Sequence, residues 1–108
     1  MPREPVMTSP PMYGHMQLAL TEAAAAGERG EVPVGAVVVA PDGTVLATGG
    51  NRTRELDDPT AHAEIVAIRA ACGVLHSERL VGCDLYVTLE PCPMCAAAIS
   101  LARIRRLY

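Results

Sequence analysis

Residues 84–99 read DLYVTLEPCPMCAAAI and join a strand-like run directly to a helix-like run. The first seven residues of this stretch predict a strand. The prolines of EPCPMC suit a first helical turn, where a missing backbone N–H would have no partner anyway, so we expect a helix that runs to about Ala102. The closing residues IRRLY predict one more strand. Strand, helix and strand in this order predict a right-handed parallel crossover.

The residues before this crossover predict a hairpin. The run VPVGAVVVA, residues 32–40, is rich in β-branched side chains and predicts a buried strand. Pro41-Asp42-Gly43 is a strong turn signal, and TVLATGG, residues 44–50, predicts the second strand. Two strands joined this tightly must pair antiparallel.

Two helices complete the expected order. Apolar residues at three- and four-residue steps predict a helix from Gly14 to Glu28. Residues 60–73 predict another, with Thr60 as its N-cap and Gly73 as its stop. The whole order is α-β-β-α-β-α-β, which predicts an α/β fold with helices packed on a mixed sheet.

The composition fits one small domain. The chain has 108 residues, half of them apolar, a net charge of −3 and three tyrosines as its only aromatic residues besides histidine. A core with so few large side chains is expected to depend on a metal or a partner subunit. The proline-rich residues 1–12 predict a flexible tail, neither signal peptide nor membrane span, before a domain of residues 13–108. We therefore expect a cytoplasmic protein without membrane association, whose four cysteines are thiols.

Cys92 and Cys95 are spaced so that both sulfurs can converge on one point at a helix start. The positive end of the helix dipole favours thiolates there, the form that binds metal. Such a pair could also be a redox couple or half of a structural zinc site. Cys72 and Cys83 are isolated in the sequence and are expected to be small core residues.

His62 lies in the first turn of the helix predicted for residues 60–73, and Glu64 follows two residues later. At about 100° per residue, both flank the apolar stripe formed by Ile65, Ile68 and Cys72, so both can face the start of the cysteine helix. One imidazole and two thiolates would leave a fourth zinc position open, as in catalytic sites, and Glu64 would be the general base. Taken singly, His62 could be an ordinary core or surface residue and Glu64 a first-turn acid.

His-Ala-Glu at 62–64 and Pro-Cys-Pro-Met-Cys at 91–95 together match the H-x-E and P-C-x-x-C signature of zinc-dependent nucleobase deaminases. From residue 13 onward the chain resembles the bacterial tRNA-specific adenosine deaminases. That resemblance implies a cytidine deaminase-like three-layer α/β/α fold and Zn²⁺ held by His62, Cys92 and Cys95. It also implies hydrolytic conversion of adenosine to inosine, with Glu64 as the proton carrier.

The resemblance implies further partners and contacts. Asn51 matches a substrate-contacting asparagine, and the backbone of Ala63 is a candidate contact to the base. The implied substrate is RNA, at the wobble position of a tRNA anticodon loop, and the implied assembly is a homodimer. The residues alone also allow Asn51 to be a plain turn residue.

Other functions remain open at this point. The family normally continues with C-terminal elements that the 108 residues lack, so a zinc-binding fragment without activity is one alternative. A deaminase of a free base or nucleoside, guanine or cytosine, is another, because EPCPMC is also common among guanine deaminases. A simple RNA-binding module is least favoured, given the net charge of −3 and the few aromatic residues.

Overall fold

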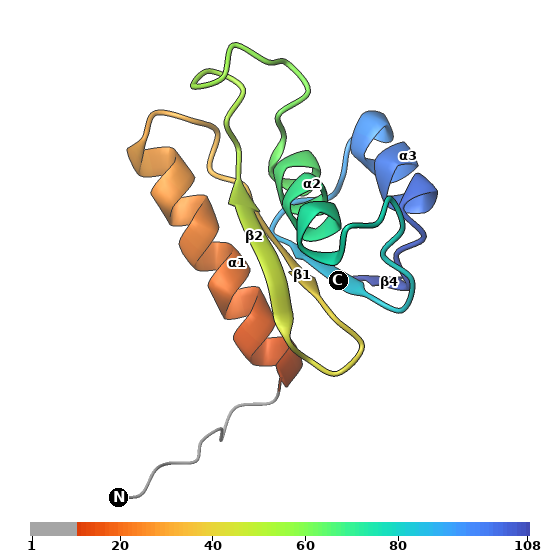
Figure 1. Cartoon of the computed structure of the whole chain (residues 1–108). Helices are drawn as coiled ribbons and strands as arrows, with labels where there is room; N and C mark the ends of the chain where they lie inside the picture. The colour runs from red at the N-terminus through yellow and green to blue at the C-terminus, as the bar shows by residue number, and fades with distance from the viewer. Residues whose placement is uncertain (1–10) are drawn as a thin grey trace, which may run out of the picture.

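The computed structural model describes residues 11–108. The elements are α1 (Pro11–Glu28), β1 (Gly35–Val39), β2 (Val45–Gly50), α2 (Ala63–Leu75), β3 (Asp84–Val87), α3 (Pro93–Leu101) and β4 (Arg106–Leu107). The expected order of helices and strands is confirmed (Figure 1). Most of the predicted tail, residues 1–10, lies outside the described residues, and the last two tail residues already belong to α1.

The four strands form one mixed sheet in the order β2-β1-β3-β4. β1 pairs antiparallel with β2, as the hairpin predicted, and also antiparallel with β3. β4 pairs parallel with β3, which confirms the crossover through α3. All five residues of β1 are buried because the strand has a neighbour on each side and helices on both faces.

The helices cover the two faces of the sheet separately, with α1 on one face and α2 and α3 on the other (Figure 1). Alternate residues of β1 point to opposite faces. Val37 packs with Ala19 of α1, whereas Val38 packs in the cluster that contains Ala67 of α2 and Ala98 of α3. The expected three-layer α/β/α arrangement is therefore confirmed.

Two glycines let the layers approach closely. A Cβ on Gly35 would lie 2.0 Å from the carbonyl oxygen of Ala19, so only glycine allows α1 to lie this close to β1. A Cβ on Gly49 would lie 2.9 Å from the backbone nitrogen of Ala67, so α2 rests directly on β2. This contact fixes how far the start of α2 reaches over the edge of the sheet.

The N-cap prediction for α2 was wrong. The helix begins at Ala63, and its N-cap is His62, whose side chain makes no capping hydrogen bond. The Thr60 hydroxyl instead donates to the carboxylate of Asp58 at 2.7 Å in the preceding turn. The hydrogen bond to Asp58 thus engages the Thr60 hydroxyl within the turn, so this hydroxyl does not cap the helix.

The predicted stop and apolar stripe of α2 also differ from the structure. The helix passes Gly73 and ends at Leu75, followed by His76 in the left-handed conformation at φ 52°. The buried face consists of Ala63, Glu64, Ala67, Ile68 and Ala71. The helix turns the face that carries its alanines toward the sheet, because these small side chains permit the close contact with β2.

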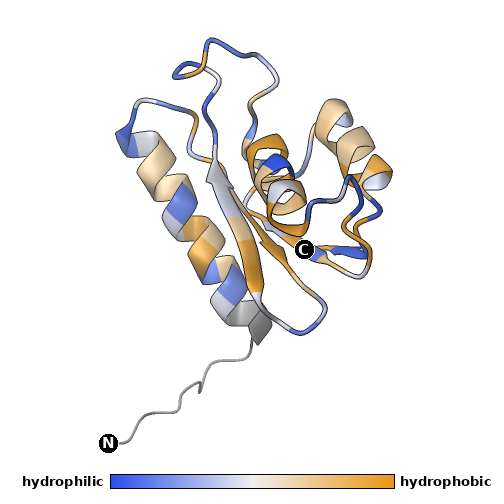
Figure 2. Ribbon diagram, viewed as in Figure 1, coloured by the Kyte–Doolittle hydropathy of each residue, from blue (hydrophilic) through white to orange (hydrophobic). Residues whose placement is uncertain are grey.

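The hydropathy colouring shows α3 as a mostly hydrophobic helix (Figure 2). α3 is apolar along most of its sequence, PMCAAAISL, yet only Cys95 is buried within it. Among the described residues, none of the helices has the length and hydropathy that crossing a bilayer requires.

Candidate metal centre and substrate pocket

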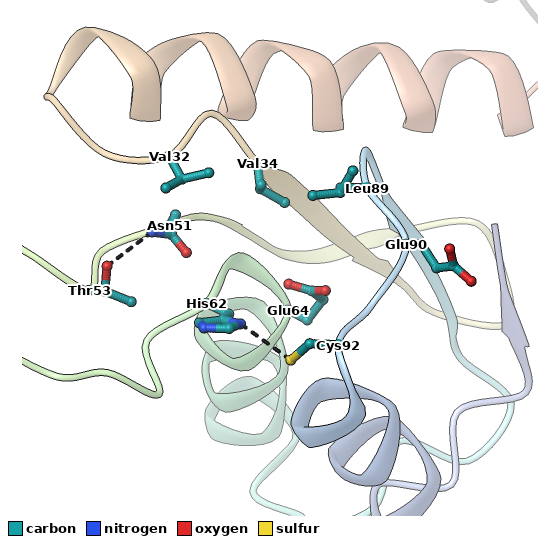
Figure 3. A pocket seen from close by; sticks show the side chains of 9 residues that line it. All are labelled: Val32, Val34, Asn51, Thr53, His62, Glu64, Leu89, Glu90 and Cys92. Carbon is teal, nitrogen blue, oxygen red and sulfur yellow. Dashed lines mark hydrogen bonds between the residues drawn. The ribbon is translucent and has the colours of Figure 1, made fainter.

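The starts of α2 and α3 bring the predicted metal ligands together. His62 and Cys92 are the two N-cap residues, both in extended backbone conformation, and neither side chain caps its own helix. The Nδ1 atom of His62 lies 3.6 Å from Sγ of Cys92 and 3.5 Å from Sγ of Cys95 (Figure 3 shows the first pair). The sequence spacing therefore predicted a real cluster.

The cluster fits a zinc ion. Its three ligand atoms lie within 4.8 Å of one another. A tetrahedral zinc with Zn–N near 2.0–2.1 Å and Zn–S near 2.3 Å would separate nitrogen from sulfur by about 3.6 Å, close to the spacings observed here. Within residues 11–108 no fourth histidine, cysteine or carboxylate joins the group. Three ligands of this kind leave one coordination position open, which is typical of catalytic rather than structural zinc.

The two thiols differ in their electrostatics. The backbone N–H of Cys95 donates to the sulfur of Cys92 and lowers the pKa of the Cys92 thiol. Burial, and then the neighbouring carboxylate of Glu64, raise the pKa of the Cys95 thiol to about 12. In the metal-free protein Cys95 therefore keeps its proton near neutral pH, and a bound cation must displace it.

The other cysteines lie outside the centre. Cys83 is 1% exposed in the core, as expected, and Cys72 is half-buried on α2. Both are free thiols, and burial raises the pKa of each. Neither residue contributes to the cluster.

A cavity of about 240 Å³ opens beside the cluster. Its lining residues, drawn in Figure 3, are Val32, Val34, Asn51, Thr53, His62, Glu64, Leu89, Glu90 and Cys92. Glu64 is 4% exposed, and its carboxylate lies at the cavity wall close to Cys92 (Figure 3). An acid and a metal-ligand set therefore share one small pocket, which is the arrangement that hydrolytic chemistry requires.

Asn51 lies across the cavity from the cluster, directly after β2. It is 6% exposed, and its Nδ2 donates to the hydroxyl of Thr53 at 3.2 Å and faces the carboxylate of Glu31 at 3.5 Å. Ala63 is fully buried and does not line the cavity. As the first residue of α2 it has a backbone N–H without a helical partner, and its contact to a base stays a prediction.

Sequence reasoning missed the side chains that surround Asn51. Glu31 and Thr53 stand alone in the sequence, and no spacing pattern connects them to residue 51. The apolar wall formed by Val32 and Leu89 was also missed, because exposed apolar residues beside strands carry no special signal. Only the fold brings Thr53, Val32 and Leu89 to one cavity and places Glu31 behind Asn51.

Comparison with known proteins identifies the family. Residues 12–108 match the cytidine and deoxycytidylate deaminase zinc-binding region. The chain belongs to this family. Zinc is therefore the cofactor, in agreement with the group of His62, Cys92 and Cys95, which could hold a metal ion.

The chain is also similar to individual deaminases. It is 72% identical over 93 residues to a tRNA-specific adenosine deaminase of Agrobacterium fabrum, which covers 86% of this chain and 60% of that protein. A structure solved in studies of A-to-I editing by tRNA:A34 deaminases at the wobble position superposes with a TM-score of 0.88 at 69% identity, covering 90% of this chain and 74% of that one. The chain thus spans about 60% of the length of curated relatives that it matches.

Guanine deaminases share the same fold. The solved structure of guanine deaminase from Bacillus subtilis has a TM-score of 0.84 and 44% identity, and the match covers 88% of this chain and 60% of that one. The deaminase architecture in this family thus serves more than one purine base.

Proposed function

We propose that the whole protein is a zinc-dependent hydrolase that converts adenosine to inosine in tRNA, at the wobble position, in the cytoplasm. The observation that carries this proposal is the convergence of His62, Cys92 and Cys95 on one point, beside a pocket that Glu64, His62 and Cys92 line. The high identity to a tRNA-specific adenosine deaminase supports the substrate class.

We assign His62, Cys92 and Cys95 as the zinc ligands. When bound, the ion would polarise the water that attacks the base and supply a Lewis acid at the pocket floor. Glu64 would take a proton from that water at its carboxylate and pass it to the ring nitrogen and then to the leaving amine. Glu64 is 4% exposed, so the surrounding wall holds its carboxylate in place at the pocket.

The opposite wall would bind the base. Asn51 would contact the substrate from the end of β2, and the backbone N–H of Ala63 would contact it from the start of α2. Val32 and Leu89 would cover the faces of the ring with apolar surface, since both are largely exposed and line the cavity.

A homodimer is part of the proposal. α3 has an apolar sequence with most of its surface uncovered, and Leu101 at its end is 73% exposed. Exposed apolar surface of this kind marks contact sites between proteins. Light scattering should give twice the monomer mass, and Leu101→Glu should lower it; a monomer at micromolar concentration would contradict this assignment.

Deamination of a free base is the second candidate, favoured by the match to guanine deaminase at 44% identity. The deciding experiment offers zinc-loaded protein an anticodon stem-loop RNA, adenosine, guanine and cytosine, with mass-spectrometric detection and Glu64→Gln as the control. Inosine in the RNA alone supports the first proposal. Product from guanine or another free base supports the second, and bound zinc without any product supports a zinc-binding fragment.

A further inference from the structure

A buried carboxylate lies behind the substrate wall of the pocket. Glu31, in the loop between α1 and β1, is 6% exposed. Its Oε2 accepts the backbone N–H of Glu55 at 2.8 Å, and its Oε1 accepts that of Arg54 at 3.2 Å. The same Oε1 faces Nδ2 of Asn51 at 3.5 Å. One side chain therefore connects three points of the segment that follows β2.

The charge state of Glu31 is set by these contacts. Burial raises the pKa of its carboxyl. The hydrogen bonds from the backbone N–H groups of Glu55 and Arg54 and from the amide of Asn51 lower this pKa by more, so it lies below the ordinary value. An ionised carboxylate only accepts hydrogen bonds. Every group that faces Glu31 must therefore present a donor.

This requirement fixes which way the amide of Asn51 points. Its nitrogen faces two acceptors, Glu31 and the hydroxyl of Thr53. The flipped amide would place its oxygen against the carboxylate and lose the hydrogen bond to Glu31, whereas the Thr53 hydroxyl can accept from the amide nitrogen or donate to the amide oxygen. Within the part of the chain that the structure describes, Oδ1 of Asn51 accepts no hydrogen bond, and it points to the side of the pocket where Glu64 lies (Figure 3).

We propose that Glu31 is a positioning residue that holds the Asn51 amide with its oxygen toward the pocket, so that this wall offers the substrate a hydrogen-bond acceptor. The matching group on the substrate is an N–H or O–H donor. The identity of that substrate rests on the proposed function, whereas the orientation of Asn51 does not. Glu31 touches no reacting atom and acts through Asn51.

Glu31→Gln is the test variant, because it keeps the shape of the side chain and removes its charge. The new amide must turn an NH₂ group toward a backbone N–H or toward Asn51, which frees Asn51 to flip. We expect the value of kcat/KM on the RNA substrate to fall roughly tenfold or more, with zinc content unchanged. Glu28→Gln is the matched control, since Glu28 is exposed and its carboxylate makes no hydrogen bond or ion pair within the described residues.

A double-mutant cycle separates positioning from a general structural role. If Glu31 acts through Asn51, Glu31→Gln should cost less than about twofold in kcat/KM once Asn51→Ala is already present. Equal costs of Glu31→Gln in both backgrounds would overturn the proposal. The melting temperature of each variant is measured alongside.

Nuclear magnetic resonance of ¹⁵N,¹³C-labelled protein gives a readout that needs no turnover. The side-chain amide of Asn51, assigned by its loss in Asn51→Ala, should exchange slowly in the wild type and shift to free-amide values in Glu31→Gln. Anticodon stem-loop RNA should shift the Asn51 side-chain carbonyl in the wild type. An Asn51 amide signal unaffected by Glu31→Gln would overturn the positioning role of Glu31. The expected change of this signal in a protein without any turnover would support the positioning role and count against the proposed function.

Discussion

The two walls of the pocket are built by different means. The metal wall, formed by His62, Cys92 and Cys95, uses side chains at the starts of α2 and α3, where the extended N-cap residues His62 and Cys92 approach each other. The substrate wall uses Asn51, which is held by Thr53 and by Glu31, twenty residues earlier in the chain. The proposed zinc ligands thus sit at the starts of helices, whereas Asn51, the proposed substrate contact, depends on a hydrogen-bond network between loops.

The largest effect is expected from removing one of the proposed zinc ligands. Cys95→Ser replaces a buried thiol by a poor zinc ligand, so zinc content and turnover should both fall to background. Metal content by mass spectrometry and the melting temperature measure the loss. Cys72→Ser is the matched control, because Cys72 is half-buried and outside the centre, and it should keep its zinc. Equal zinc loss in both variants would show that the serine change acts through folding instead.

Removing the acid should separate chemistry from metal binding. Glu64→Ala should lower turnover by about 100- to 10,000-fold, the usual contribution of a general acid–base residue, with zinc content unchanged. Rapid-quench or mass-spectrometric assays measure the rate. Glu78→Ala is the control, since its carboxylate is 88% exposed on the surface. Retained turnover in the Glu64 variant would remove this residue from the mechanism.

The pH dependence of zinc binding should sharpen the contrast between the two thiols. Cys95 has a pKa of about 12 in the metal-free protein, so it is protonated below that value and must release a proton when zinc binds. The proton released by Cys95 should therefore make the zinc affinity rise about tenfold per pH unit between pH 7 and 8.5. The affinity should fall as the pH is lowered. Calorimetry in buffers of different ionisation enthalpy counts the released protons. Release of no proton at pH 7.5 would contradict the assignment of Cys95.

The smallest effect is expected on the substrate wall. Thr53→Val removes one of the two acceptors of the Asn51 amide but leaves Glu31 in place, so kcat/KM should fall only about two- to fivefold. Thr44→Val makes the same chemical change in the exposed hairpin turn and should have no effect. A loss from Thr53→Val as large as that from Glu31→Gln would show that Thr53 contributes as much as Glu31 to holding the amide.

The sequence predicted the metal wall because its information is local. Cys92 and Cys95 lie in one turn, and His62 and Glu64 lie two residues apart at another helix start. The antiparallel β1–β2 hairpin and the parallel pairing of β4 with β3 followed from turn signals and from the crossover rule, whereas the pairing of β1 with β3 was not predicted.

The errors and omissions arose from tertiary contacts. Thr60 was expected to cap α2, but the carboxylate of Asp58 takes its hydroxyl. The buried face of α2 is displaced from the predicted stripe because Gly49 admits the helix close to β2. The contacts of Glu31 depend on how residues 51–55 fold around its carboxylate. No pattern in the sequence predicts that arrangement.

X-ray absorption at the zinc edge of the zinc-loaded chain tests the central claim most directly, because it requires no turnover. We expect two sulfur ligands, one imidazole nitrogen and one further light atom, with Zn–S near 2.3 Å. Cys95→Ser should remove one sulfur from this shell. A zinc bound by three or four sulfurs, or by no sulfur, would contradict the three-ligand centre at the helix starts.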